Sequence, residues 1–123
     1  MSEQPEYTQE EANALLPELR ASLRTIQQAR RVILEGAERV GRTAPLNGGG
    51  EVTQEYWDAM ATLRREVESI VERGIVLRDP ERGLIDFPGR VEGREVFLCW
   101  RLDEDRVGWW HGPESGFSGR HPL

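Results

Sequence analysis

Residues 74–101 read GIVLRDPERGLIDFPGRVEGREVFLCWR, and this stretch decides the fold because short apolar runs alternate there with turn residues. Each run has the length and composition of a β-strand. We expect strands at 75–78, 84–87 and 94–101, and a further strand at 106–111. The pattern predicts an antiparallel meander of three or four strands, followed by an irregular tail. The turn residues that separate the strands are 79–83, 88–89, 92–93 and 103–105.

The chain before this stretch has the apolar spacing of two helices. Residues 8–41 open with a capping box formed by Thr8 and Glu11, and apolar residues then recur in steps of three and four. Pro17 lies too deep for a first-turn proline, so either the helix kinks there or a short helix gives way to a new one. A second helix follows, capped by Thr53 and ended by Gly74. The apolar seam of the first helix is Ala12, Leu16, Leu19, Leu23, Ile26, Ile33, Ala37 and Val40, interrupted by Arg30.

Residues 41–50, GRTAPLNGGG, are expected to form a flexible loop that joins the helices as an antiparallel hairpin. Helices followed by strands predict an α+β fold in a single domain, 1–123. A long helical hairpin spans 7–74, and the β-meander with its tail spans 75–123. The hairpin is the element available to cover the apolar face of the sheet. Because two such hairpins complete a four-helix bundle, we expect a homodimer through the helices.

The composition argues against several classes of function. All sixteen basic side chains are arginine, and the absence of lysine excludes Schiff-base and P-loop chemistry. The net charge is −6 and no segment is a basic patch, so we expect no nucleic-acid partner. No apolar run is long enough to span a bilayer, so we expect no membrane partner. Residues 1–6 do not resemble a signal peptide, and a single cysteine fits a reducing cytoplasm.

Aromatic and basic residues gather in the β half, where three tryptophans lie within eleven residues. Strand alternation puts Cys99 and Arg101 on one face of the strand 94–101, and we expect Trp110 on that same face. Arginine offers a planar fork for carboxylate or phosphate, so we expect a surface that binds a small anionic ligand or a protein partner. The alternative is a compact core that uses tryptophan to fill volume. The candidate ligand-binding residues are Asp86, Arg101, Trp110, His111 and Arg120.

Two catalytic alternatives use residues of the same region. Asp86, His111 and His121 could supply three ligands to the metal of a hydrolase, although their spacing matches no recognised metal motif. Cys99 could act as a nucleophile with His111 as its base. A cysteine in mid-strand between two large apolar residues is more often a buried apolar group. We therefore expect no cofactor and no metal, and we identify no catalytic residue.

Four runs resemble the bacterial family known as domain of unknown function 2203: YTQEEANALLPEL (7–19), GIVLRDPERGLIDFP (74–88), GREVFLCWR (93–101) and WWHGPESGFSGRHPL (109–123). The resemblance covers almost the whole chain. It implies a shared structural or binding surface on the β half, and it implies no reaction. One difference lies at 102–105, which reads Leu-Asp-Glu-Asp where the family has a Gly-Glu pair. The family's distinctive residues match Asp86, Phe87, Cys99, Trp100, Arg101, Trp110, His111, Phe117 and Arg120.

Three hypotheses about function stay open at this point. The preferred one is a non-enzymatic, cytoplasmic, self-associating protein that binds a ligand or partner through the tryptophan, arginine and histidine side chains of its β half. The second is a metal-assisted hydrolase, and the third is a purely structural assembly protein that acts through its helices. In the helical half, Arg30 either reaches solvent at the edge of the bundle or pairs with Glu66 or Glu68.

Overall fold

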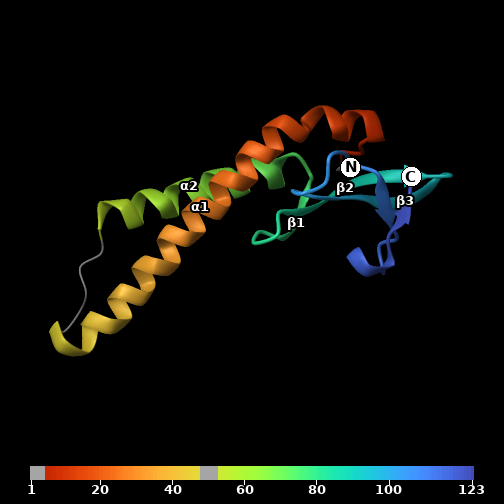
Figure 1. Ribbon diagram of the computed structural model, residues 1–123. Helices are drawn as coiled ribbons and strands as arrows, with labels where there is room; N and C mark the ends of the chain where they lie inside the picture. Colours follow the sequence, from red (N-terminus) through yellow and green to blue (C-terminus); the bar gives the residue numbers. More distant parts are fainter. Residues whose placement is uncertain (1–4, 48–52) are drawn as a thin grey trace, which may run out of the picture.

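The computed structural model describes residues 5–47 and 53–123, and it confirms the predicted α+β fold. A helical hairpin precedes an antiparallel sheet whose strands follow chain order, β1-β2-β3-β4-β5 (Figure 1). The tail supplies the fifth strand, so the meander is longer than predicted. The elements are α1 (Gln9–Asn47), α2 (Gln54–Glu72), β1 (Val76–Asp79), β2 (Leu84–Val91), β3 (Arg94–Arg101), β4 (Trp109–His111), the 3-10 helix η1 (Phe117–Gly119) and β5 (His121–Pro122).

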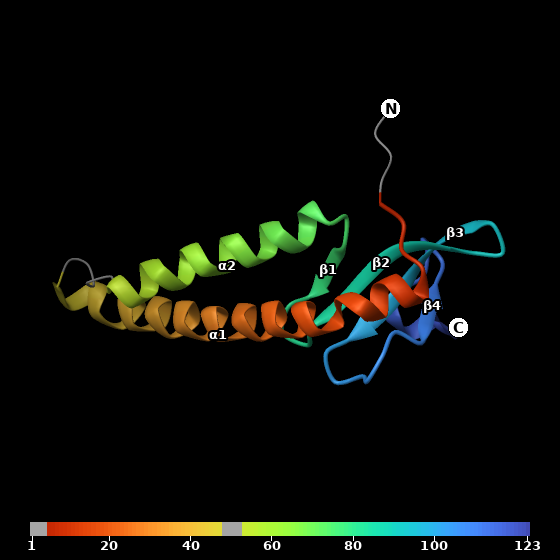
Figure 2. The ribbon, with the colours of Figure 1, turned by 90° about the horizontal axis from the view of Figure 1, so that it is seen from above.

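The hairpin and the sheet share α1. Its N-terminal part lies over the sheet, and the rest runs beside α2 away from the sheet (Figures 1 and 2). Helices and sheet thereby contribute to one apolar core, which gives the strands the covered face that an isolated meander lacks. Large residues that contribute to this core are Leu16, Leu19, Leu23, Ile26, Ile70, Ile75, Ile85, Phe87, Leu98 and Trp100.

The capping box of α1 is confirmed, and the helix extends beyond its predicted end. The backbone N of Thr8 donates to Oε1 of Glu11 at 3.0 Å, and N of Glu11 donates to Oγ1 of Thr8 at 3.1 Å. The helix is continuous through Pro17, and Figure 1 shows it change direction in its N-terminal third, so the kinked alternative is correct. Residues 41–47 of the predicted loop are helical, so neither Gly41 nor Pro45 ends the helix as the sequence suggested. Residues 48–50 of that loop, and residues 1–4 of the segment assessed as a signal peptide, lie outside the described residues.

The buried side of α1 follows the predicted seam only as far as Ile26. Beyond it, the buried residues are Ala29 and Gly36, while Ala37 is exposed. At 100° per residue, Ala29 and Gly36 lie about 100–120° around α1 from Ala12, on the side that faces α2 rather than the sheet. A Cβ atom at Gly36 would lie 2.4 Å from Cδ2 of Tyr56, so glycine allows α2 to pack closely there. The buried seam residues are Ala12, Leu16, Leu19, Leu23 and Ile26, and the side chain of Val40 lies outside the described residues.

Arg30 is partly exposed, and its guanidinium forms no ion pair with Glu66 or Glu68, all three of which the structure describes. Glu68 pairs instead with Arg64 on its own helix, with Nε and Oε1 3.2 Å apart. The alternative in which Arg30 reaches solvent therefore agrees with the structure.

Three further local signals are confirmed. Oγ1 of Thr53 accepts a hydrogen bond from N of Tyr56 at 3.1 Å, which caps α2. Gly74 follows the last turn of α2 with a φ of 76°, the left-handed conformation expected after a helix. Glu92 and Gly93 have φ values of 52° and 79°, as a tight two-residue hairpin requires.

β2 runs through Pro88 and Gly89, where the sequence predicts a turn that ends the strand. Pro88 pairs in register with Phe97 of β3 on one side. On the other side β1 does not reach Pro88, because β1 begins at Val76, which pairs with Asp86. The carbonyl of Pro88 instead accepts a hydrogen bond from N of Tyr7 at 2.7 Å. The N–H and C=O of a strand residue point the same way, so the missing N–H of proline faces this open edge and no ladder bond is lost. The prediction of a turn at 88–89 is therefore wrong.

β4 is shorter than the predicted strand 106–111 because α1 holds the segment before it. N of Val107 donates to Oδ1 of Asn13 at 2.7 Å, and Nε2 of Gln9 donates to the carbonyl of Val107 at 2.9 Å. These bonds occupy the backbone groups that Val107 would need in a strand. The tail, predicted to be irregular, returns as β5 beside β4.

Candidate functional site

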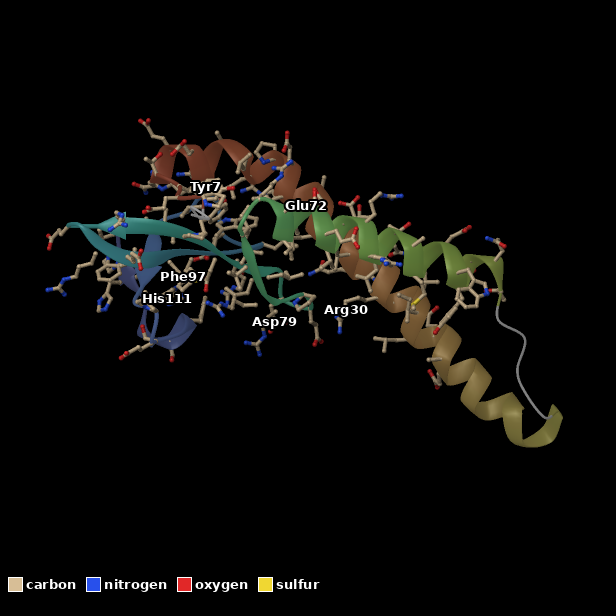
Figure 3. The ribbon with its side chains drawn as sticks, turned by 180° about the vertical axis from the view of Figure 1, so that it is seen from behind. Tyr7, Arg30, Glu72, Asp79, Phe97 and His111 are labelled. Atoms are coloured by element: carbon tan, nitrogen blue, oxygen red, sulfur yellow. The ribbon has the colours of Figure 1, made fainter. Side chains whose placement is uncertain are left out.

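The sheet has one face under α1 and one outer face. Directly paired residues of antiparallel strands point to the same face, and the register pairs Asp86 with Cys99 and Phe97 with His111. Figure 3 shows Tyr7 between α1 and the sheet, with Phe97 and His111 on the opposite face. The β3 residues that enter the core are Val96, Leu98 and Trp100, as alternation predicts.

Asp86, Cys99 and His111 meet on the outer face, and we call them the Asp–Cys–His cluster. Their carboxylate, thiol and imidazole atoms lie within 4.8 Å of one another, and all three side chains are buried. Oδ2 of Asp86 accepts a hydrogen bond from Nε of Arg78 at 2.7 Å and lies 2.9 Å from Nε2 of His111. The other oxygen, Oδ1, is buried without a hydrogen-bond partner among the described residues.

Neither ring nitrogen of His111 is free. Nε2 faces the carboxylate of Asp86, and Nδ1 lies 2.8 Å from the carbonyl oxygen of Gly112. Both ring nitrogens therefore already have a hydrogen-bond partner. A nucleophilic cysteine needs a base that can take its proton. His111 is therefore not positioned to activate Cys99.

The environment of Cys99 also disfavours a nucleophilic role. Burial, and after it the negative charge of Asp86, raises the pKa of the Cys99 thiol from 9.0 to about 11. Nη1 of Arg120, 3.9 Å from Sγ, acts in the opposite direction and does not cancel these effects. Because the thiolate is the nucleophile, the geometry favours the interpretation of Cys99 as a buried thiol.

Cys99 is expected to react with a disulfide reagent such as Ellman's reagent far more slowly in the folded protein than in the unfolded one. A pKa raised by two units lowers the thiolate fraction at pH 8 about 100-fold, and burial lowers access further. The measurement is a rate at pH 8 in EDTA, with and without guanidinium. It reports one site because the chain has a single cysteine. Equal rates in the two states would contradict the prediction.

Arg120 lies on the outer face between two aromatic rings. Its Cζ is 4.7 Å from the ring centroid of Trp109 and 4.1 Å from that of Phe117. Nη1 and Nη2 donate to the two carboxylate oxygens of Glu104 at 3.0 and 2.7 Å. The hydrogen bonds to Glu104 raise the pKa of Arg120 above its usual value. The guanidinium thus has a bidentate partner within its own chain.

Arg101 lies on the same face and is also paired. Its Nε donates to Oδ1 of Asp103 at 2.6 Å, and its Cζ lies 4.9 Å from the ring centroid of Phe117. The hydrogen bond from Arg101 holds the pKa of Asp103 below its usual value. Oε1 of Glu104 accepts from the backbone N of Arg101 at 2.9 Å, so this carboxylate joins β3 to the tail.

Trp110 and His121 do not belong to this surface, contrary to the expectation from alternation. The register pairs Trp110 with Leu98, so its side chain packs against the core. His121 pairs with Trp110, and the two rings stack with centroids 4.7 Å apart. The alternative metal site of Asp86, His111 and His121 therefore does not form, because Cys99 rather than His121 lies beside Asp86 and His111. A shift of register by one residue moves a whole strand to the other face, and the sequence does not fix the register after an irregular segment.

Comparison with family models matches residues 6–123 to DUF2203, a family described as an uncharacterized conserved protein. The chain belongs to the DUF2203 family. Comparisons of this DUF2203 chain with curated proteins and with solved structures gave no match. Within the part of the chain that the structure describes, neither helix is long and apolar enough to cross a membrane.

Two residues of this DUF2203 site, Arg78 and Glu104, were not predicted from the sequence. Arg78 could have been found, because a hairpin that turns at 79–83 brings β1 beside Asp86. Glu104 lies in a stretch predicted to be a solvated turn, and nothing in its spacing shows that the carboxylate folds back onto Arg120.

Proposed function

We propose that the protein is a self-associating protein whose helical hairpin packs against the hairpin of a second copy. One observation carries this proposal: large apolar side chains stay exposed on both helices of the hairpin. The exposed fractions are 60% for Leu34, 57% for Trp57, 41% for Met60 and 58% for Val71.

Three of these residues form one stripe along α2. At about 100° per residue, Trp57, Met60 and Val71 fall within about 60° of the helix circumference. A hairpin of two helices buries only the faces that meet each other and the sheet. A second hairpin would cover this stripe and complete a four-helix bundle.

The groove between the helices lies on the other side of the hairpin from this stripe, because its α2 residues are centred roughly 180° around the helix from the stripe. Arg24 of α1 and Glu55 and Asp58 of α2 line this groove. Arg24 and Glu55 form no ion pair within residues 5–38 and 53–123. A dimer that buries the apolar stripe would therefore leave this charged groove open to solvent.

The Trp57→Glu variant is expected to raise the dissociation constant of the dimer at least roughly 30-fold. The reason is that the dimer loses about 2 kcal/mol of free energy from burying the Trp57 side chain. Sedimentation velocity over a range of micromolar concentrations measures the effect. Wild type should sediment as a dimer and the variant should shift toward the monomer.

Leu123→Glu is the matched control, because Leu123 is an exposed apolar residue, 45% accessible, at the end of the β half. This variant should dimerise like wild type. Leu23→Asp would be uninformative, since Leu23 is fully buried in the core and its replacement would unfold the chain. A wild-type protein that is monomeric throughout would refute the proposal.

Binding of a small anionic ligand on the outer face stays a prediction. Arg101 and Arg120 each donate to a carboxylate of the same chain, Asp103 and Glu104. An anion would have to displace these carboxylates, so the arginine pairs favour self-association over ligand binding as the function.

A further inference from the structure

We propose that the Asp–Cys–His cluster is a binding site for Zn²⁺, separate from the helical surface that would mediate self-association. Asp86, Cys99 and His111 offer one oxygen, one sulfur and one nitrogen, the three kinds of ligand atom that zinc takes in proteins. They come from β2, β3 and β4, three neighbouring strands of one sheet, so a rigid element positions all three.

The unpaired oxygen of Asp86 points to a ligand. Its side chain is 2% exposed, and Oδ1 has no hydrogen-bond partner among the described residues. A buried carboxylate oxygen without a partner is costly. Oδ2 already accepts from Arg78, so Oδ1 is the atom that can bind a metal while the pair with Arg78 persists.

Each proposed ligand also has a supporting partner that is not itself a ligand. Nδ1 of His111 faces the carbonyl of Gly112 at 2.8 Å, which orients the ring with Nε2 toward the cluster. Nη1 of Arg120 lies 3.9 Å from Sγ of Cys99, where it can stabilise a thiolate. Such outer partners are typical of metal-binding histidines and carboxylates.

The ligand set selects the metal. A thiolate disfavours Mg²⁺ and Ca²⁺, which prefer oxygen, and favours Zn²⁺. Zinc–ligand bonds of about 2.0–2.3 Å place the ligand atoms of a tetrahedral site about 3.5 Å apart. The atoms lie within 4.8 Å of one another here, so binding would shorten the distances between them by about 1.3 Å or less. Three protein ligands leave one position for water.

Binding replaces protons by the metal. Zn²⁺ takes the place of the proton on Sγ of Cys99 and of the proton on Nε2 of His111, and both protons pass to solvent. The two nearby cations do not oppose this strongly. Arg120 is neutralised by Glu104, and the side chain of Arg78 is 43% exposed, so solvent screens it.

The test titrates tag-free, chelator-treated protein with Zn²⁺ and with Co²⁺. We expect one equivalent per chain, a rise in melting temperature, and, with Co²⁺, the charge-transfer band of a cobalt–thiolate bond. The band identifies Cys99 without any variant, because the chain has no other cysteine. Cys99→Ala, checked for folding by circular dichroism, should lose the band and about 100-fold or more of its Zn²⁺ affinity.

His121→Ala is the matched control, because His121 lies on β5 and stacks on Trp110, away from the cluster. It should keep the stoichiometry and the band, whereas His111→Ala should lose both. The proposal fails if folded wild-type protein binds no equivalent of either metal, or if it binds cobalt without the thiolate band. It also fails if His121→Ala loses binding while remaining folded.

Discussion

Replacing Trp100 by alanine is expected to lower the free energy of unfolding by about 4 kcal/mol. Trp100 is fully buried, and its Nε1 donates to the carbonyl of Glu104 at 3.1 Å. The guanidinium of Arg20, from α1, lies 5.4 Å from the ring centroid and donates to carbonyls of Glu104 and Asp105. The variant would therefore leave a large cavity and loosen the contact between α1 and the segment after β3. The free energy of unfolding of a small domain is about 5–15 kcal/mol in total, so this loss is a large share of it.

Urea unfolding followed by far-ultraviolet circular dichroism measures this loss. Trp57→Ala is the control, because Trp57 is 57% exposed on the hairpin. At a concentration that keeps the chain monomeric, the control should change the free energy of unfolding by less than about 0.5 kcal/mol. Similar losses for the two variants would show that the core does not depend on Trp100 in this way.

Asp86→Ala is expected to cost about 3 kcal/mol in metal-free protein, because breaking a buried charged pair leaves its partners unsatisfied. Asp86 joins Arg78 of β1 to His111 of β4 through a single oxygen, Oδ2. His111 is 2% exposed and would keep a buried N–H without an acceptor. Arg78 is 43% exposed and can turn to water, so it contributes less to the loss.

The control for this second variant is Asp103→Ala. Asp103 also pairs with an arginine, Arg101, but its side chain is 67% exposed. An exposed pair contributes little to stability, so the control should lower the free energy of unfolding much less than Asp86→Ala does. Equal losses in urea unfolding of the two variants would mean that burial does not set the strength of the Asp86 network.

The parts of the fold that could be predicted are those fixed by neighbouring residues. Thr8 with Glu11 and Gly74 mark helix ends because their bonds and dihedrals involve only a few residues. The turn at Glu92-Gly93 and the strand 94–101 were predictable for the same reason. The turn assigned to Pro88-Gly89 was wrong because proline's effect depends on which edge of the sheet its nitrogen faces, and that edge is set by Tyr7 and the start of β1.

The candidate site was predicted less well. The sequence places Asp86, Cys99, Arg101, His111 and Arg120 in one region, and the structure brings them to one face. The assignment of Trp110 to that face failed because the register of β4 against β3 depends on how Val107 is held by α1. A one-residue shift in that register exchanges the two faces.

The order of elements, the helix caps, the tight hairpin turn and the alternation of faces along β3 follow from local backbone preference and apolar periodicity. Which polar side chains meet depends on the tertiary fold. Asp86, Cys99 and His111 become neighbours through strand register, and Glu104 reaches Arg120 through the fold of the tail. Those contacts join residues distant in sequence, so their geometry follows from packing rather than from spacing along the chain.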